Sequence, residues 1–228
     1  MKDNRIKVIL IIKNNMKKFK TLFSIAICAL LFSSCGVSNL ANYSIGLKTV
    51  ESPANAKQQF GETKIVNFQD GETNKYRYED DYINIVWYVD SKRFYFDLTN
   101  KSGHTIKINW DDISYVDYNG KVGRVMHSGV KYTERNNSQP ASTVPKGATL
   151  SDILIPTENV YFISGRFGGW REKYLIPCVY NDAATRDAQA SSYVGKTMTI
   201  MMPIMIENVQ NDYTFTFNID KLLNKTKK

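Results

Sequence analysis

Apolar and polar residues alternate in four segments of the chain. Apolar side chains recur at every second position from 83 to 89, from 94 to 98, from 106 to 110 and from 213 to 219, and most positions between them are polar. Alternation with a period of two is typical of strands with one buried and one solvent-facing side. The segments are rich in Ile, Val, Phe, Tyr and Trp, which favour strands. We therefore expect four half-buried strands.

Turn residues separate the predicted strands. Asn119-Gly120 lies between two further strand-like segments, 113–118 and 121–126. This dipeptide is the strongest short signal for a two-residue type I′ hairpin. A penultimate strand at 197–207 is joined to the last strand by residues 208–212. Pro203 lies inside that strand, and because proline has no N–H for the ladder, we expect an edge or a bulge there.

Two more short strands, at 149–155 and 159–164, are punctuated by Pro156. Residues 182–193 differ from the rest because they are alanine-rich. They open with Asn181-Asp182, a possible N-cap, and they predict a short surface helix or a loop. Seven or more short strands separated by turns favour an all-β fold, an antiparallel β-sandwich, with an open barrel as the alternative.

The chain begins with the pattern of a secretory signal. Lys17, Lys18 and Lys20 precede a run of about a dozen mostly apolar residues, 21–32, which small residues follow. A helix that spans a bilayer needs ~20 apolar residues, so this run is too short to be a membrane span. Met16 directly precedes the lysines, and we predict that it is the true start of the chain.

The end of the apolar run, Leu31-Phe32-Ser33-Ser34-Cys35-Gly36, resembles the lipobox of bacterial lipoprotein precursors. Phe32 stands where this family usually has leucine or another aliphatic residue. The resemblance implies cleavage before Cys35 and attachment of lipid there, with more than one acyl chain, which is enough for stable anchoring. Gly36, in place of aspartate, implies the outer membrane. The lack of an acidic cluster after Cys35 favours its periplasmic face.

These features divide the chain into four parts: a signal peptide at 1–34, a lipidated tether at 35–59, a β-sandwich domain at 60–221 and a basic tail at 222–228. A strand near 45–50 would start the domain earlier. About 190 mature residues are enough for one domain with a sizeable core.

Residues 82–219 resemble the immunoglobulin-like domains of uncharacterised bacterial envelope lipoproteins. The likeness rests on the lipobox, on the segment from Phe94 to Ser102 and on the closing hairpin. It implies an immunoglobulin-like antiparallel β-sandwich and an envelope location, and it implies no activity. The cysteine pair of antibody domains is absent.

The formal charge of +8 comes mostly from the N-terminal segment. Residues 1–34 contain seven of the 30 basic residues and one of the 22 acidic residues, which leaves 23 basic against 21 acidic residues, a net +2, for the mature chain. A nucleic-acid-binding surface needs clustered cations that face phosphates. The charge distribution therefore argues against a nucleic-acid partner.

No catalytic motif is found in the sequence. In the mature chain Cys178 is the one cysteine beyond Cys35, and its apolar neighbours predict a packed, unreactive thiol. His104 and His127 lack the ligand spacing of a zinc site. We expect no enzymatic activity, no metal and no cofactor. A pocket that brings His127 or His104 within hydrogen-bond reach of Cys178 or of an acidic side chain is the alternative, and it would make the protein a hydrolase.

One loop is a candidate binding site. Residues 164–171 place three glycines around Phe167 and Trp170, with Arg166 and Arg171 beside these rings. Exposed aromatic residues next to arginine are typical of binding hot spots, and aromatic rings also stack on sugars. In the alternative interpretation, Trp170 is buried at one end of the sandwich core.

Together these features predict a non-catalytic, lipid-anchored cell-envelope protein with a protein-interaction or accessory role. Its expected partners are the membrane, through the lipid anchor, and an unidentified envelope protein or glycan. The alternative function is a glycan- or peptidoglycan-binding module that uses the 165–171 loop.

Overall fold

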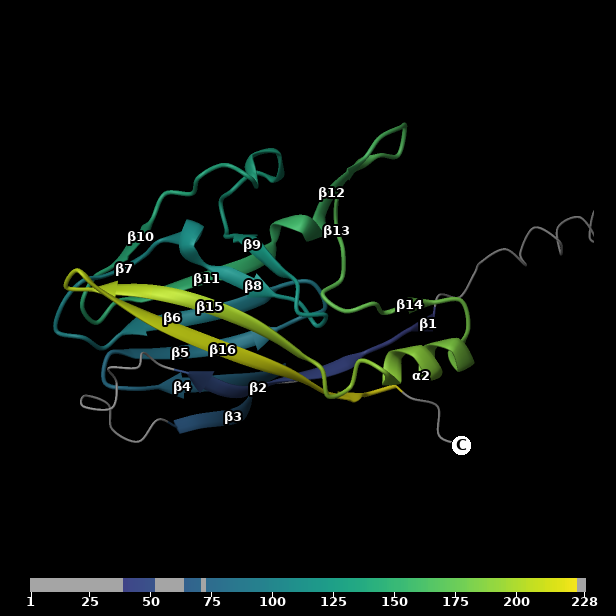
Figure 1. Cartoon of the computed structure of the whole chain (residues 1–228), viewed down its shortest axis with the longest axis horizontal. Coiled ribbons are helices and arrows are strands. Elements are labelled where there is room, and N and C mark those ends of the chain that lie inside the picture. Colours follow the sequence, from purple (N-terminus) through teal and green to yellow (C-terminus); the bar gives the residue numbers. More distant parts are fainter. Residues whose placement is uncertain (1–38, 52–63, 71–72, 225–228) are drawn as a thin grey trace, which may run out of the picture. The chain divides into compact units, whose positions relative to one another are not determined.

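The computed structural model describes residues 39–51, 64–70 and 73–224 of the chain. Antiparallel strands make up most of this part (Figure 1), and the all-β sandwich predicted from the sequence is confirmed. The signal peptide and the lipid site that we predict at residues 1–35 lie outside the described residues, and so do residues 225–228 of the basic tail.

The first layer is a meander of four strands with a fifth strand added at its end. Its strands are β3 (Lys64–Asp70), β4 (Thr73–Glu79), β5 (Ile83–Val89), β6 (Phe94–Asn100) and β11 (Thr149–Pro156). Each strand of the meander pairs with the next, and β6 also pairs with β11.

The second layer is built around the long hairpin of β15 (Thr197–Ile206) and β16 (Val209–Leu222). The other strands of this layer are β2 (Tyr43–Glu51), β7 (Ile106–Ile108), β8 (Ser114–Val116), β9 (Val122–Met126) and β10 (Ser142–Val144). β2 pairs with β16. Along β15, β8 pairs with residues 199–201 and β7 pairs with residues 204–206. β9 pairs with both β8 and the end of β11, so the two layers are continuous at that edge.

Short elements complete the described part. Two are small two-stranded pairs: β1 (Asn39–Leu40) pairs with β14 (Val179–Tyr180), and β12 (Val160–Ile163) pairs with β13 (Gly169–Glu172). The others are helix α2 (Ala183–Ser191) and three 3-10 turns, η2 (Trp110–Asp112), η3 (Tyr132–Glu134) and η4 (Thr157–Asn159). No helix of the described residues is long and apolar enough to cross a membrane.

Aromatic side chains fill the space between the layers. Trp87 of β5 lies with its ring centroid 5.0 Å from that of Phe215 and 5.4 Å from that of Phe217, both on β16. Tyr78 of β4 makes an edge contact with Phe215. All four side chains are almost completely buried. The period-two pattern places these residues on the inner face of each strand, and such aromatic burial contributes much of the energy of a core.

The strands predicted at 83–89, 94–98 and 213–219 are confirmed as β5, β6 and part of β16. The strand predicted at 106–110 ends at Ile108, because the chain turns into η2. The predicted surface helix is also confirmed. Asp182 caps it, accepting a hydrogen bond of 2.8 Å from the N–H of Thr185.

The two predicted hairpin turns differ from expectation. β8 and β9 do form a hairpin around Asn119-Gly120, but Gly120 alone has a positive φ, +83°, so the turn is not type I′. Asp117 closes it instead, because its carboxylate accepts hydrogen bonds from the N–H groups of Asn119 and Lys121. A two-residue turn with positive φ at both positions joins β15 to β16, at Glu207-Asn208.

Pro203 does not lie in an edge strand, because β15 is paired on both sides. It lies at a break in one of the ladders. On that side β8 pairs with residues 199–201 and β7 with residues 204–206, so Pro203 falls between the two partners. The missing N–H therefore costs no hydrogen bond along that edge.

The predicted tether at 35–59 is too long. The domain begins at Asn39, and residues 43–51 form β2, which pairs with β16 from Tyr43–Leu222 to Glu51–Thr214. The strand considered at 45–50 is therefore real. Leu47 is buried in the main core, which explains why this polar-looking segment joins the sheet.

Candidate functional site

A two-stranded hairpin extends away from the sandwich. It consists of β12, the turn at 164–168 and β13, and we call residues 160–172 the hairpin arm. Figure 1 shows the arm in green, extending away from the two sheets. Its tip exposes large apolar side chains, with Phe162 58% exposed, Ile163 44% and Phe167 86%. An exposed apolar cluster of this kind marks an interaction site more often than a scattered surface residue does.

The arm has two different faces, because its strands alternate their side chains. Phe162 lies opposite Trp170 on one face, and the two rings are in edge contact with centroids 5.4 Å apart. Tyr161 lies opposite Arg171 on the other face, and Ile163 follows Tyr161 on the same side.

An ion pair fixes the base of the arm. Glu172 accepts two hydrogen bonds from Arg93, which lies between β5 and β6, and a third from the hydroxyl of Tyr132. The hydrogen bonds from Arg93 hold the pKa of the Glu172 carboxyl below its usual value, although burial alone would raise it. Two backbone hydrogen bonds, from Lys173 to Asn159 and from Leu175 to Ser91, hold the chain that leaves the arm.

Trp170 packs at the base of the arm. Its ring centroid lies 6.0 Å from that of Tyr132, and the Arg135 guanidinium lies 5.1 Å from the ring centre. It packs against a small cluster of Met126, Ile155 and Val160, separate from the main core. Trp170 is therefore half-buried, and it does not close the end of the main core as the alternative interpretation required.

Glycines allow the sharp turn at the tip. Gly165 and Gly169 have φ values of +115° and +136°, which side chains rarely adopt. A Cβ on Gly168 would lie 2.2 Å from the carbonyl oxygen of Ile163. The aromatic ring of Phe167 is left in solvent, with the Arg166 guanidinium 5.7 Å from its centre.

The structure brings together one part of the predicted site. Arg166, Phe167 and Arg171 are exposed on the arm, while Trp170 supports it from one side. The exposed side chains of Tyr161, Phe162 and Ile163 were missed by the sequence prediction, because a short apolar run in a predicted strand is ordinarily buried. Its proximity to a glycine-rich turn was the one signal that pointed to exposure.

The histidines and Cys178 do not form a catalytic pair. His127 lies flat on Trp110, with ring centroids 4.0 Å apart, and its Nδ1 lies 3.2 Å from Oδ2 of Asp152. His104 pairs with Glu207 on the surface. Cys178 is buried, and burial raises the pKa of its thiol to about 11. The predicted burial of Cys178 is confirmed, and its lack of reactivity stays a prediction.

The buried Asp152 carboxylate stabilises this region. Burial would raise its pKa, but hydrogen bonds from His127 and from the N–H groups of Ser128 and Ile153 outweigh burial and lower it. Among the described residues, no three His, Cys, Asp or Glu side chains are arranged to hold a metal ion.

Comparison with known proteins gives no family. No protein-family model matches the chain, and no curated protein matches it. A solved structure titled "X-ray structure of Northeast Structural Genomics Consortium target SoR45" aligns with 81% of this chain and 94% of its own, at 14% identity and a TM-score of 0.26. A likeness this weak carries no argument about fold or function.

Proposed function

We propose that this chain is a non-catalytic, lipid-anchored cell-envelope protein whose immunoglobulin-like sandwich binds a protein partner through the hairpin arm. The observation that carries the proposal is the contrast between the tip and the base of the arm. Phe167 at the tip is 86% exposed, whereas the Glu172 side chain at the base is 7% exposed and ion-paired. An apolar tip on a fixed support loses little conformational entropy on binding.

The composition of the arm indicates the chemistry of the partner. From residue 160 to 171 the arm contains Arg166 and Arg171 and no acidic residue. Aromatic residues and arginine are enriched at binding hot spots. A partner with an apolar pocket and an acidic rim would complement this surface.

The predicted lipid anchor limits where the partner can be. Asn39 follows Cys35 by four positions, and an extended chain spans about 3.5 Å per residue. With lipid on Cys35, Asn39 would lie within roughly 14 Å of the attachment point. We therefore propose a partner in the same membrane, the outer membrane, or at its periplasmic surface.

The side chains with catalytic potential support a binding role. His127 is held between Trp110 and Asp152, and the raised pKa of Cys178 leaves its thiol protonated near neutral pH. Each of these two side chains packs inside the domain, and among the described residues His127 contacts Asp152 and His104 contacts Glu207, neither of them near Cys178.

Site-specific crosslinking in cells tests the proposal. A photo-crosslinking phenylalanine analogue replaces Phe167 in one variant of the full-length protein and Val209 in a matched control. Val209 is also apolar and 61% exposed, but it lies at the turn between β15 and β16. We expect mass spectrometry to identify one or two envelope proteins that are captured from position 167 and not from position 209.

A second variant tests the contribution of the apolar tip. Replacing both Phe162 and Phe167 by serine should weaken co-purification of the captured protein by about 30-fold, the effect of losing one hot spot. Equal capture from positions 167 and 209, no protein captured at 167, or unchanged co-purification of the double variant would each refute a protein-binding arm.

A further inference from the structure

A surface groove of about 480 Å³ lies on the side of the sandwich next to the hairpin arm. Its walls come from the β8–β9 hairpin, from η4 and the start of β12, and from residues 172–179. This volume is within the range of sites that hold small molecules. The tip of the arm, residues 162–168, does not line it.

Four tyrosines line the groove: Tyr115, Tyr118, Tyr161 and Tyr174. Tyr115 is buried, and its hydroxyl lies 3.5 Å from the sulfur of Met198. Tyr161 and Tyr174 are each 37% exposed. Among the described residues, the hydroxyls of Tyr118, Tyr161 and Tyr174 have no hydrogen-bond partner. The groove therefore offers aromatic ring surface to a ligand, and it also offers free hydroxyl groups.

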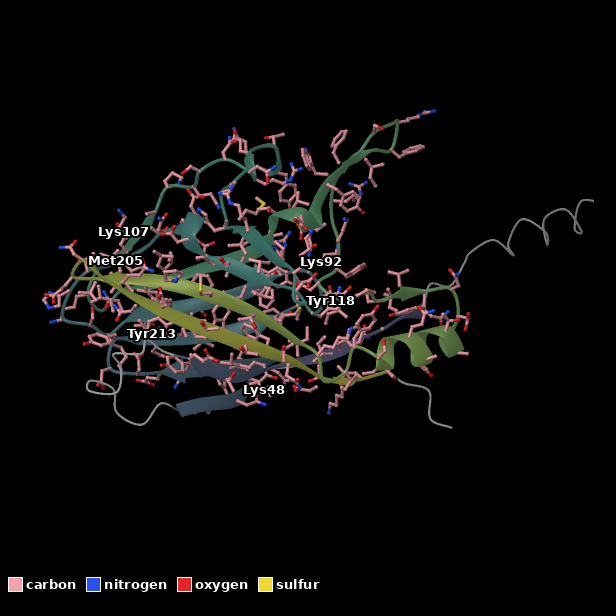
Figure 2. The ribbon with its side chains drawn as sticks, viewed as in Figure 1. Lys48, Lys92, Lys107, Tyr118, Met205 and Tyr213 are labelled. Atoms are coloured by element: carbon pink, nitrogen blue, oxygen red, sulfur yellow. The ribbon has the colours of Figure 1, made fainter. Side chains whose placement is uncertain are left out.

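A lysine ammonium lies over three of these rings, the exposed rings of Tyr161 and Tyr174 and the partly buried ring of Tyr118. Lys173 lines the groove, whereas Lys92 and Lys196 lie outside its lining. Lys173 lies 5.7 Å from the centre of Tyr161, Lys92 lies 5.0 Å from that of Tyr174, and Lys196 lies 5.4 Å from that of Tyr118. Figure 2 labels Lys92 and Tyr118 at the same end of the sandwich. None of the three lysines forms an ion pair with a described residue.

The acidic side chains of the groove already have partners. Glu158 pairs with Lys121, and Glu172 pairs with Arg93. Asp117 accepts hydrogen bonds from two backbone N–H groups of its own turn. Asp117 keeps its negative charge, because these donors are neutral, while the cations Lys121 and Arg124 of the lining are both ion-paired. Three unpaired lysines against one aspartate leave the groove and its rim net positive.

We propose that this groove binds an acidic saccharide, a sugar chain that carries carboxylate or phosphate groups. The C–H faces of sugar rings would pack on the exposed tyrosines, whose π faces carry partial negative charge. The anionic groups would accept charge-assisted hydrogen bonds from Lys173 in the groove, and from Lys92 and Lys196, which lie beside it over two of its tyrosine rings. The site goes beyond the proposed protein-binding function, because it uses other residues than the tip of the arm.

The test is a titration of the purified mature protein by calorimetry. The probes are a galacturonic acid trimer and a muropeptide, with maltotriose as the neutral sugar and a tetraglutamate peptide as the non-sugar anion. We expect at least one acidic sugar to bind, and to bind more than 10-fold tighter than maltotriose and tetraglutamate. Failure of both acidic sugars to bind would overturn the proposal. Equally tight binding of maltotriose would overturn the role of charge, and equally tight binding of tetraglutamate would overturn the role of the rings.

Two variants locate the site. Lys173→Gln removes one charge and keeps a polar side chain that is one atom shorter, and we expect about 10-fold weaker binding of the acidic sugar. Lys48→Gln is the matched control, since Lys48 is an exposed lysine of β2 outside the groove, labelled in Figure 2. Equal affinities of the two variants would place the binding elsewhere. Phe167→Ser should leave sugar binding unchanged, which separates this site from the protein-binding tip.

Discussion

Arg93 and Glu172 form a two-point ion pair between the β5–β6 turn and the base of the hairpin arm. The Nε and Nη2 atoms of Arg93 lie 2.9 and 2.5 Å from the two carboxylate oxygens of Glu172. This geometry is the strongest form of a protein ion pair, because both hydrogen bonds are charge-assisted and parallel. The pair joins residues that are far apart in the sequence, so the orientation of the arm depends on it.

We predict that Glu172→Gln destabilises the protein by about 2 kcal/mol, because the partly buried Arg93 loses its charged acceptor. The free energy of unfolding in urea measures the change. Glu79→Gln is the control. Glu79 likewise forms an ion pair, with Lys101. This pair is exposed, and exposed pairs contribute little to stability. Equal losses in the two variants would show that Glu172 has no special role.

The same pair predicts an acid-dependent stability. The folded pKa of Glu172 lies below its unfolded value near 4.5, so its contribution is fully present above pH 4.5 and is lost as the pH falls through the lower folded value. We expect the contribution of this pair to wild-type stability to decrease as the pH falls below about 4.5. Glu172→Gln should lose less stability below this pH, in urea titrations at several pH values. A variant with the wild-type slope would contradict this assignment.

Asp80 connects a turn to both layers of the sandwich. Its Oδ1 accepts hydrogen bonds from the N–H groups of Tyr82 and Ile83, and its Oδ2 accepts from the hydroxyls of Tyr78 and Tyr213. Asp80→Ala leaves these buried donors without an acceptor, and we expect a loss of about 3 kcal/mol. Tyr213→Phe removes one of the bonds and should cost about 1 kcal/mol. Urea unfolding of both variants measures the two losses in the free energy of unfolding. Similar small losses in both variants would show that Asp80 is not a buried acceptor.

Strand prediction succeeded where burial is one-sided. Trp87 and Phe215 belong to strands in which every second side chain faces the core. The alternation of apolar and polar residues around them was therefore sufficient to predict both the strand and its buried face. The strand predicted at 159–164 is also present, as β12, but the pattern did not reveal that Tyr161, Phe162 and Ile163 are exposed. Their consecutive apolar side chains are exposed because none of the strands that the structure describes forms a second layer over the arm, and the local sequence carries no information about such a layer.

The groove and the ends of the domain depend on contacts between distant segments. β2 joins the sheet by pairing with β16 at the other end of the chain, which no local pattern shows. The pairs of tyrosine and lysine at the groove and its rim likewise come from distant segments, for example Lys92 and Tyr174. Composition revealed many tyrosines, but only the folded chain places four of them around one cavity.

The turn between β15 and β16 predicts a stabilising substitution. Glu207 has a φ of +48° and Asn208 a φ of +67°. A side chain such as glutamate rarely adopts this conformation, whereas glycine adopts it freely. We expect Glu207→Gly to stabilise the protein by about 0.5–1 kcal/mol, because its surface pair with His104 contributes little. Gly120→Ala, at φ +83°, should have the opposite effect. Thermal unfolding shows whether each variant unfolds at a higher or a lower temperature than the wild type. A higher unfolding temperature for Gly120→Ala would contradict the argument.

Cys178 should react slowly with alkylating reagents while the protein is folded. Burial raises its pKa from 9.0 to about 11, which lowers the thiolate fraction at pH 8 by about 100-fold, and the thiolate is the reactive form. The surrounding cluster of Ala41, Tyr180 and Ala190 also blocks access to the sulfur. The rate of iodoacetamide labelling at Cys178, followed by mass spectrometry of its peptide, should therefore rise at least about 100-fold when urea unfolds the domain. A peptide with a free cysteine at the same pH gives the reference rate. Labelling of the folded protein at that reference rate would show an accessible, activated thiol and would reopen a nucleophilic role for Cys178.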